Sequence, residues 1–332
     1  MLSMFLSSSN CCQVLSSDYL DLDVFLNIHV FYRLAGYRIL TKLNQSTCDL
    51  IVLLRGIPPR VYTEFTGTVH VYDYVKESEL DYAHFFPSAS SIHLISVSHR
   101  SESSFFVASS YIAGYLPVIP EIWTSSSHYE KSIKTPLHIS NFKPMQSDRF
   151  QEQLVQLARM GLIKIYGAKW DKIGILASSL TYHSANKLLA KANHCFGLMY
   201  PYQRGTSLSG RMWQAPLHGC YVLSEPQTNI FHCPGVVEVD DYLQAIHSLP
   251  TQGELLASEA RDFWKNKTQQ LASDLGLSLS FQYFDREVLY ARLMLYQHHL
   301  ACQWDTYVRL PCESAVLLLR RILRRLVHRS TN

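Results

Sequence analysis

The chain has 332 residues, of which 47% are hydrophobic and 17% charged, and its formal net charge is +3 at pH 7. This length is enough for two domains, and this composition is typical of a globular protein that buries a large core. A net charge so close to zero argues against a dedicated nucleic-acid-binding protein. The eight cysteines form no C-x-x-C pair and no zinc-like spacing with histidine, which favours a reducing, cytoplasmic compartment.

The first part of the chain alternates predicted strands and helices. Apolar runs predict strands at residues 49–54, 68–72 and 92–98, and helical spacing predicts helices at 26–43 and 108–115. The uncharged segment 105–120 is too short, and too rich in Ser, Gly and Pro, for a membrane span. Strands that alternate with helices in this way predict an α/β domain at residues 1–123.

A second α/β domain is predicted at residues 135–275, after a Ser-rich linker at 124–134. Its predicted strands are 137–141, 163–167, 195–199, 220–223 and 235–239, and its predicted helices are 148–160, 184–192, 212–218, 241–249 and 253–274. The remaining residues, 276–332, are predicted to form a helical tail. Arginines and apolar residues occupy opposite faces of its last part, which favours contact of residues 314–329 with an anionic membrane surface. Packing against its own domain is the alternative.

The segment RGTSLSGRMWQAPLHGCYVLSE, residues 204–225, combines a small polar loop, a short helical run and a strand. The loop exposes backbone N–H groups, the helix start adds the positive end of a dipole, and Arg211 adds a full charge. This combination predicts a site for a diphosphate. Arg204 also falls at the predicted carboxyl edge of the sheet, although both arginines could instead be ordinary surface or helix-capping residues.

Several motifs of the second domain follow one another in the order of a known family. They read YGAKW at 166–170, AKAN at 190–193, SGRMWQA at 209–215 and GCYVLSE at 219–225. In this order they resemble the C-terminal domain of GT-B glycosyltransferases, most closely the group with CgeB-like and family 1-type transferases. The resemblance implies an α/β fold of two Rossmann-like domains that face a cleft, with C-terminal helices, and a nucleotide-sugar donor bound mainly by the second domain.

The resemblance also implies roles for individual residues. Arg211 would neutralise the diphosphate, and Gln214 stands where the family usually has a glutamate that holds the ribose hydroxyls. Gln214 can still bond to hydroxyls but lacks the charge. Pro216 removes a backbone hydrogen bond, which predicts a short or kinked helix. The implied donor-binding residues are Tyr166, Gly167, Trp170, Ser209, Gly210, Arg211 and Gln214.

The sequence therefore predicts a glycosyltransferase that moves a sugar from a nucleotide-sugar to a glycan, lipid-linked or protein acceptor. Fixed cations and N–H groups can stabilise the leaving diphosphate, so no metal ion and no cofactor besides the donor substrate are expected. The catalytic candidates are Arg211 and Arg204, with Asp73 and His99 after strands of the first domain as possible bases. The D-x-D at residues 21–23 precedes the first predicted strand and is not expected to bind metal.

Two alternatives remain open. Gln214 and Pro216 are compatible with a non-catalytic, GT-B-shaped binding protein, and a nucleotide-sugar epimerase could use the same fold. In every case the sequence predicts a cytoplasmic protein without nucleic-acid partners. Residues 314–329 could attach it peripherally to the inner face of a membrane.

Overall fold

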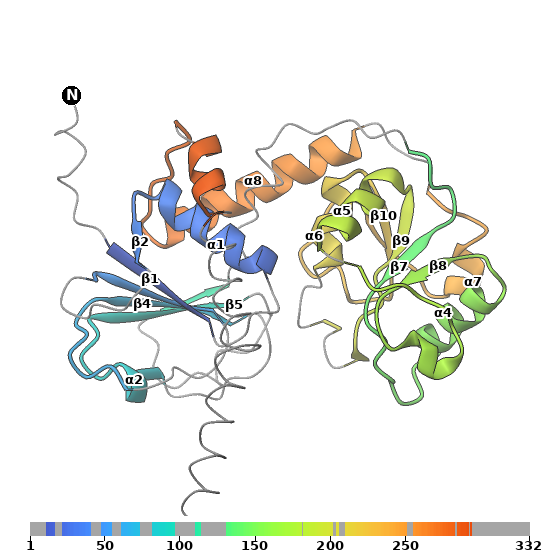
Figure 1. The fold of residues 1–332 in the computed structure, drawn as a ribbon, viewed down its shortest axis with the longest axis horizontal. Helices are drawn as coiled ribbons and strands as arrows, with labels where there is room; N and C mark the ends of the chain where they lie inside the picture. Colours follow the sequence, from blue (N-terminus) through green and yellow to red (C-terminus); the bar gives the residue numbers. More distant parts are fainter. Residues whose placement is uncertain are drawn as a thin grey trace, which may run out of the picture.

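The computed structural model describes most of the chain, and its elements form two α/β domains (Figure 1). The described residues are 11–16, 22–40, 48–54, 61–73, 82–96, 110–113, 131–180, 182–201, 204–205, 210–250, 255–282, 284–291 and 293. The first domain contains the amino-terminal sheet and the helices that cover it. The second domain contains the sheet formed after residue 131, with its own helices. This arrangement confirms the predicted α/β fold of two parallel-sheet domains.

In the described residues, the sheet of the first domain has six parallel strands in the order β2-β1-β3-β4-β5-β6. They are β1 (Cys11–Ser16), β2 (Arg38–Leu40), β3 (Leu50–Leu54), β4 (Thr68–Asp73), β5 (Ser91–Ser96) and β6 (Ser110–Ala113). Helix α1 (Leu22–Leu34) contributes to the core on one face, and α2 (Tyr82–Phe85) to a separate core on the other. The apolar runs of β3, β4 and β5 are buried on both faces, as the sequence predicts.

Two predicted helices of the first domain are wrong. The helix expected at 26–43 ends at Leu34, because Gly36 takes a positive φ of 88° and the N–H of Tyr37 bonds back to the carbonyl of Tyr32. The chain then enters β2. The helix expected at 108–115 is instead the edge strand β6, in which Tyr111 and Ile112 pair with β5. Strand β1 was not predicted.

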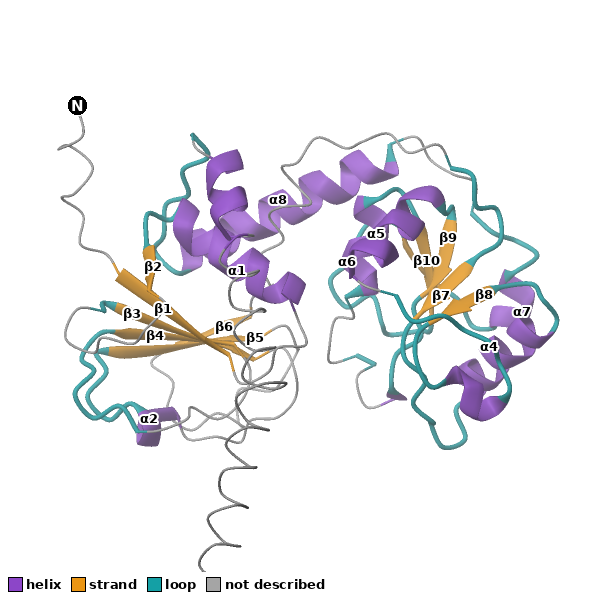
Figure 2. Cartoon of the chain, in the orientation of Figure 1, coloured by secondary structure: helices purple, strands orange, loops and turns teal. Residues whose placement is uncertain are grey.

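In the second domain, the sheet has five described strands, all parallel, in the order β11-β10-β9-β7-β8. Strands β10, β9, β7 and β8 are labelled in Figure 2. They are β7 (Leu137–Ile139), β8 (Lys164–Tyr166), β9 (His194–Phe196), β10 (Tyr221–Ser224) and β11 (Val236–Glu238). Their positions confirm the five predicted strands. Helices α4 (Arg149–Arg159) and α7 (Tyr242–Ala245) pack on one face, and α5 (Tyr182–Lys191) and α6 (Arg211–Leu217) on the other. A short 3-10 helix, η2 (Trp170–Ile173), follows β8.

Local sequence explains where these helices begin and end. The side chain of Asp148 accepts a hydrogen bond from the N–H of Gln151 and caps α4, and Asp241 caps α7 in the same way. Helix α7 ends at Ala245 and is shorter than the predicted 241–249. Helix α6 has seven residues with Pro216 in its last turn, which confirms the short helix that the proline predicts.

Helix α8 (Leu256–Asp274) belongs to the cores of both domains (Figure 1). Its first half places Ala260 and Trp264 in the second-domain core, and its last turns place Leu271 and Ala272 in the first-domain core. The chain continues along the first domain, where residues 284–291 add Phe284, Val288 and Ala291 to the same core. An ion pair between Arg33 and Glu287 ties this segment to α1. The beginning of the predicted tail is therefore built into the first domain.

The predicted membrane-contacting segment, 314–329, lies outside the described residues and stays a prediction. Of the helices that the structure describes, none combines the length and the apolar character needed to cross a bilayer.

Candidate anion-binding site

The strand order of the second domain defines where its ligands should bind. The chain leaves β7 for β8 on one side of the sheet and later returns to β9 on the other side, so the direction of winding changes between β7 and β9. In open α/β sheets, ligands bind outside the carboxyl ends of the strands at this change of direction. In this protein the position is occupied by Ser140, directly after β7, and Gly197, directly after β9.

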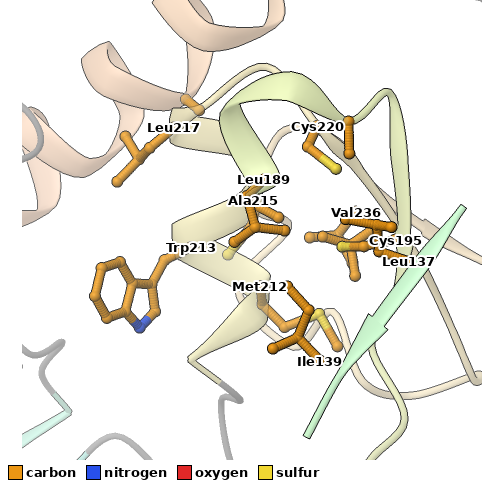
Figure 3. Packing of buried hydrophobic residues seen from close by; sticks show 14 of the residues in the cluster. Leu137, Ile139, Leu189, Cys195, Met212, Trp213, Ala215, Leu217, Cys220 and Val236 are labelled. Atoms are coloured by element: carbon orange, nitrogen blue, oxygen red, sulfur yellow. The ribbon is translucent and has the colours of Figure 1, made fainter. Parts of the chain in front are cut away.

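Arg211, the first residue of α6, is fixed at this edge of the sheet. Its Nε donates to the carbonyl oxygen of Ile139 at 2.8 Å, and its Nη1 donates to Oε1 of Gln214 at 2.6 Å. These two bonds orient the guanidinium between the end of β7 and the first turn of α6. The following residue, Met212, is fully buried and points toward Ile139 (Figure 3), which anchors the start of α6 against β7.

Gln214 is 4% exposed and completes the first turn of α6, where its N–H donates to the carbonyl of Gly210. A glutamate here would place a carboxylate against the Arg211 guanidinium, whereas Gln214 supplies only an amide oxygen. The Arg211 guanidinium is therefore held at this position by an uncharged amide and not by a carboxylate.

Gly167, Tyr166 and Trp170 hold the end of β7 in place. Gly167 has a φ of 135°, and a Cβ on it would lie 1.9 Å from the carbonyl oxygen of Ser140, so only glycine fits. The carbonyl of Tyr166 accepts from the N–H of Ser140, and the indole N–H of Trp170 donates to the carbonyl of Ser140 at 2.7 Å. Trp170 is 1% exposed, so its ring is part of the domain core and helps to fix the position of Ser140. Contact of these residues with a nucleotide base stays a prediction.

His138 and Ser140 form a polar pair at this edge that the sequence reasoning missed. His138 is 1% exposed, and its Nδ1 lies 3.0 Å from the carbonyl oxygen of Phe196. A carbonyl can only accept, so we assign the proton to Nδ1, and Nε2 then accepts from the Ser140 hydroxyl at 2.7 Å. Burial is the main cause that lowers the pKa of His138 to about 4, and the charge of Arg211 adds to it against the opposing bond to Phe196.

A period-two spacing could have revealed this pair. Residues i and i+2 of a strand share a face, and here they are a histidine and a serine at the end of an apolar strand.

Arg204, the other predicted arginine, is paired inside the protein. Its Nη2 lies 2.7 Å from Oδ2 of Asp148 and 3.0 Å from Oε1 of Glu225, and it also donates to the carbonyl of Met199. Glu225 is fully buried and accepts a further bond from the N–H of Met199, while burial raises its pKa. Two carboxylates balance the Arg204 charge, so these contacts favour a structural role in which it ties the segment after β9 to the end of β10.

The other candidates lie at the margins of the described structure. Gly210 is the exposed residue before α6 and offers no side chain to cap it. Ser209 and His99 lie outside the described residues, and of Asp73 only the backbone, at the end of β4, is described. Where the chain is described, no group of three or more His, Cys, Asp or Glu side chains could hold a metal ion. The expectation that no metal is needed stays a prediction.

No protein-family model matches the sequence, and no curated protein sequence is significantly similar to it. Solved structures do match. A mutant of T4 phage BGT in complex with UDP-glucose has a TM-score of 0.54 at 8% identity, over 79% of this chain and 97% of that one. The DNA-modifying enzyme β-glucosyltransferase, solved with and without uridine diphosphoglucose, has a TM-score of 0.51 at 8% identity, over 86% and 98% of the chains. HepE from Anabaena, in complex with UDP and glucose, has a TM-score of 0.49 at 11% identity, over 80% of this chain and 99% of that one.

The chain has the GT-B fold. Both sheets are parallel, in both the second strand lies outside the first, and structures of GT-B glycosyltransferases match nearly over their whole length. Identities this low show the fold and not the reaction. The predicted architecture of two Rossmann-like domains is confirmed, and Ser140 and Arg211 lie at the edge of the second sheet where its winding changes direction.

Proposed function

We propose that this protein is a glycosyltransferase that moves a sugar from a nucleotide-sugar to a glycan, lipid-linked or protein acceptor. The observation that carries the proposal is the position of Arg211, which is hydrogen-bonded to the end of β7 where the winding of the second sheet changes direction. The GT-B fold supports it, because the T4 phage enzyme of the same fold was solved with UDP-glucose. The order of the motifs between residues 166 and 225 supports a place near the CgeB-like and family 1-type transferases.

The chemistry that this site would supply is stabilisation of a leaving group. When the bond between the sugar and the diphosphate breaks, negative charge builds up on the phosphate oxygens. A cation that is already oriented by bonds to Ile139 and Gln214 stabilises that charge without having to reorganise. We propose no metal ion for this step, and we propose the donor phosphate itself, Asp73 or His99 as the base that activates the acceptor.

The donor proposal is tested by thermal shift with a panel of nucleoside diphosphates, followed by titration with the one that stabilises most. Arg211→Ala should weaken binding by about tenfold to a hundredfold, since a charge-assisted hydrogen bond contributes roughly 1.5–3 kcal/mol. Arg159→Ala is the matched control. Arg159 lies at the exposed end of α4 and bonds to the carbonyl of Ile173, and its loss should leave binding unchanged. Absence of binding by every nucleoside diphosphate, or equal binding by both variants, would overturn the proposal.

Product analysis with a labelled nucleotide-sugar separates the three readings of the fold. Transfer of label to an acceptor supports the glycosyltransferase. An isomerised donor would instead identify an epimerase, and binding without any product, over a broad acceptor panel, would identify a non-catalytic binding protein.

A further inference from the structure

The hydrogen bonds of His138 determine what Ser140 can offer to a ligand. In both neutral and charged states Nδ1 is held as a donor by the carbonyl of Phe196, so only Nε2 can change its protonation. With Nε2 unprotonated, the Ser140 hydroxyl gives its proton to His138 at 2.7 Å. Ser140 then has only lone pairs left for a ligand. This state is unsuited to an anion, which needs donors.

We propose that an anion bound at Arg211 reverses this pair, with His138 taking up a proton at Nε2 and Ser140 turning its hydroxyl to donate to the anion. One proton moves from solvent to Nε2, the new N–H donates to Oγ of Ser140, and the Ser140 O–H leaves His138 for a phosphate oxygen. Ser140 would contact the ligand, and His138 would be a positioning residue that acts through it. This inference rests on the proposed diphosphate site and names its proton-linked donor.

The surroundings of His138 favour this exchange only when an anion is present. Phe196 of β9 contacts its Nδ1, and Trp170 of η2 packs against the ring at 5.6 Å between centroids; neither group ionises. Arg211 of α6 is the charged group whose field acts on the ring, and it disfavours protonation. A bound diphosphate would place negative charge beside Arg211 and Ser140, and this charge would offset the field of Arg211 at the His138 ring. The opposition to His138 protonation would therefore fall with binding.

The test is calorimetric titration of the whole protein with a nucleotide-sugar in buffers of different ionisation enthalpy, which counts the protons bound per ligand. A nucleotide-sugar is the right probe because both of its phosphates are esterified and do not titrate between about pH 5.5 and 8, the range in which a perturbed histidine responds. Wild-type protein should take up a fraction of a proton that grows as the pH falls. Its affinity should improve by up to about tenfold per pH unit.

Three variants locate the proton. His138→Gln should abolish the uptake and flatten the pH dependence, and Ser140→Ala should weaken binding and reduce the uptake. His194→Gln is the matched control, since His194 is also buried in this sheet and bonds to the carbonyl of Pro250, but it begins β9 at the opposite edge. This control should behave as wild type.

Each outcome of these titrations either supports or overturns the inference. A nucleotide-sugar that binds without proton uptake, or with the same uptake in His138→Gln, overturns the inference and leaves the proposed function intact. Failure of every nucleotide-sugar to bind overturns both. If His138→Gln does not fold, the comparison of wild type with Ser140→Ala takes its place. Equal proton uptake and equal affinity in these two proteins would exclude the proposed exchange between His138 and Ser140.

Discussion

Replacement of Gly167 by Ala should destabilise the second domain strongly. The added Cβ would lie 1.9 Å from the carbonyl oxygen of Ser140 and 2.5 Å from its carbonyl carbon. Both atoms belong to the backbone at the end of β7, which is hydrogen-bonded to Tyr166 and Trp170 and cannot move away alone. Alanine must also adopt a φ of 135°, which L-residues rarely take.

The size of the effect follows from separating these two causes. Positive φ alone costs roughly 1–2 kcal/mol for a non-glycine residue. Gly161→Ala measures the cost of an ordinary left-handed φ without a clash, because Gly161 has a φ of 72° and no atom within 4 Å of an added Cβ. In Gly167→Ala the backbone clash adds to it, and we expect a loss of about 3–5 kcal/mol, at the upper end of what single substitutions cause.

The assay is urea unfolding of both variants beside wild type, with hydrogen exchange to assign the loss to the second domain. Gly167→Ala should also bind nucleoside diphosphates more weakly. A shift of Ser140 would move the adjacent carbonyl oxygen of Ile139, which accepts a hydrogen bond from Arg211. Equal losses of stability in the two variants would refute the reasoning, because they would mean that the close approach of residues 140 and 167 is absent.

Three further outcomes are expected. Burial raises the pKa of Glu225, so its contribution to stability is complete below its ordinary pKa and is lost as the pH rises through the raised pKa. In urea unfolding over that pH range, Glu225→Gln should gain stability relative to wild type as the pH rises. Trp264→Ala should destabilise the second domain and Leu271→Ala the first, by roughly 2–5 kcal/mol each, and hydrogen exchange should show the separation. Gln214→Glu should weaken the binding of pyrophosphate about tenfold in a competition assay, because its carboxylate would take up part of the Arg211 charge. An unchanged affinity would argue against Arg211 as the phosphate ligand.

Much of the second domain could be predicted from the sequence because its elements are short and strongly patterned. Apolar residues mark β7, β8 and β9, and the caps of two neighbouring helices are visible as Asp148 and Asp241. The elements of the first domain are harder to predict from the sequence. Helical spacing continues past Leu34, and only the left-handed turn at Gly36 shows that the chain bends into β2. In β6, pairing with β5 decides the structure of four residues whose own pattern fits either element.

The candidate site was predictable in part, for a physical reason. Arg211 could be found because its position after a glycine, at the start of a short helix, has a local signature. The pairing of Arg204 with Asp148 and Glu225 could not, because these partners are 56 and 21 residues away along the chain and meet only in the folded domain. The contact between Gly167 and Ser140 is likewise set by the register of β7 and β8, which no local pattern reports.

The position of α8 has a consequence for the order in which a nascent chain can fold. The core of the first domain joins Leu26 and Ile28 of α1 to Leu271, Phe284 and residues near 290. Contacts of such long sequence separation form late. The first domain therefore remains incomplete while the ribosome makes the entire second domain. The second domain, although it is synthesised later, can complete its fold first. Until residue 291 has emerged, α1 exposes the apolar surface that the end of α8 later covers, which makes the interval of synthesis the period of greatest risk of aggregation.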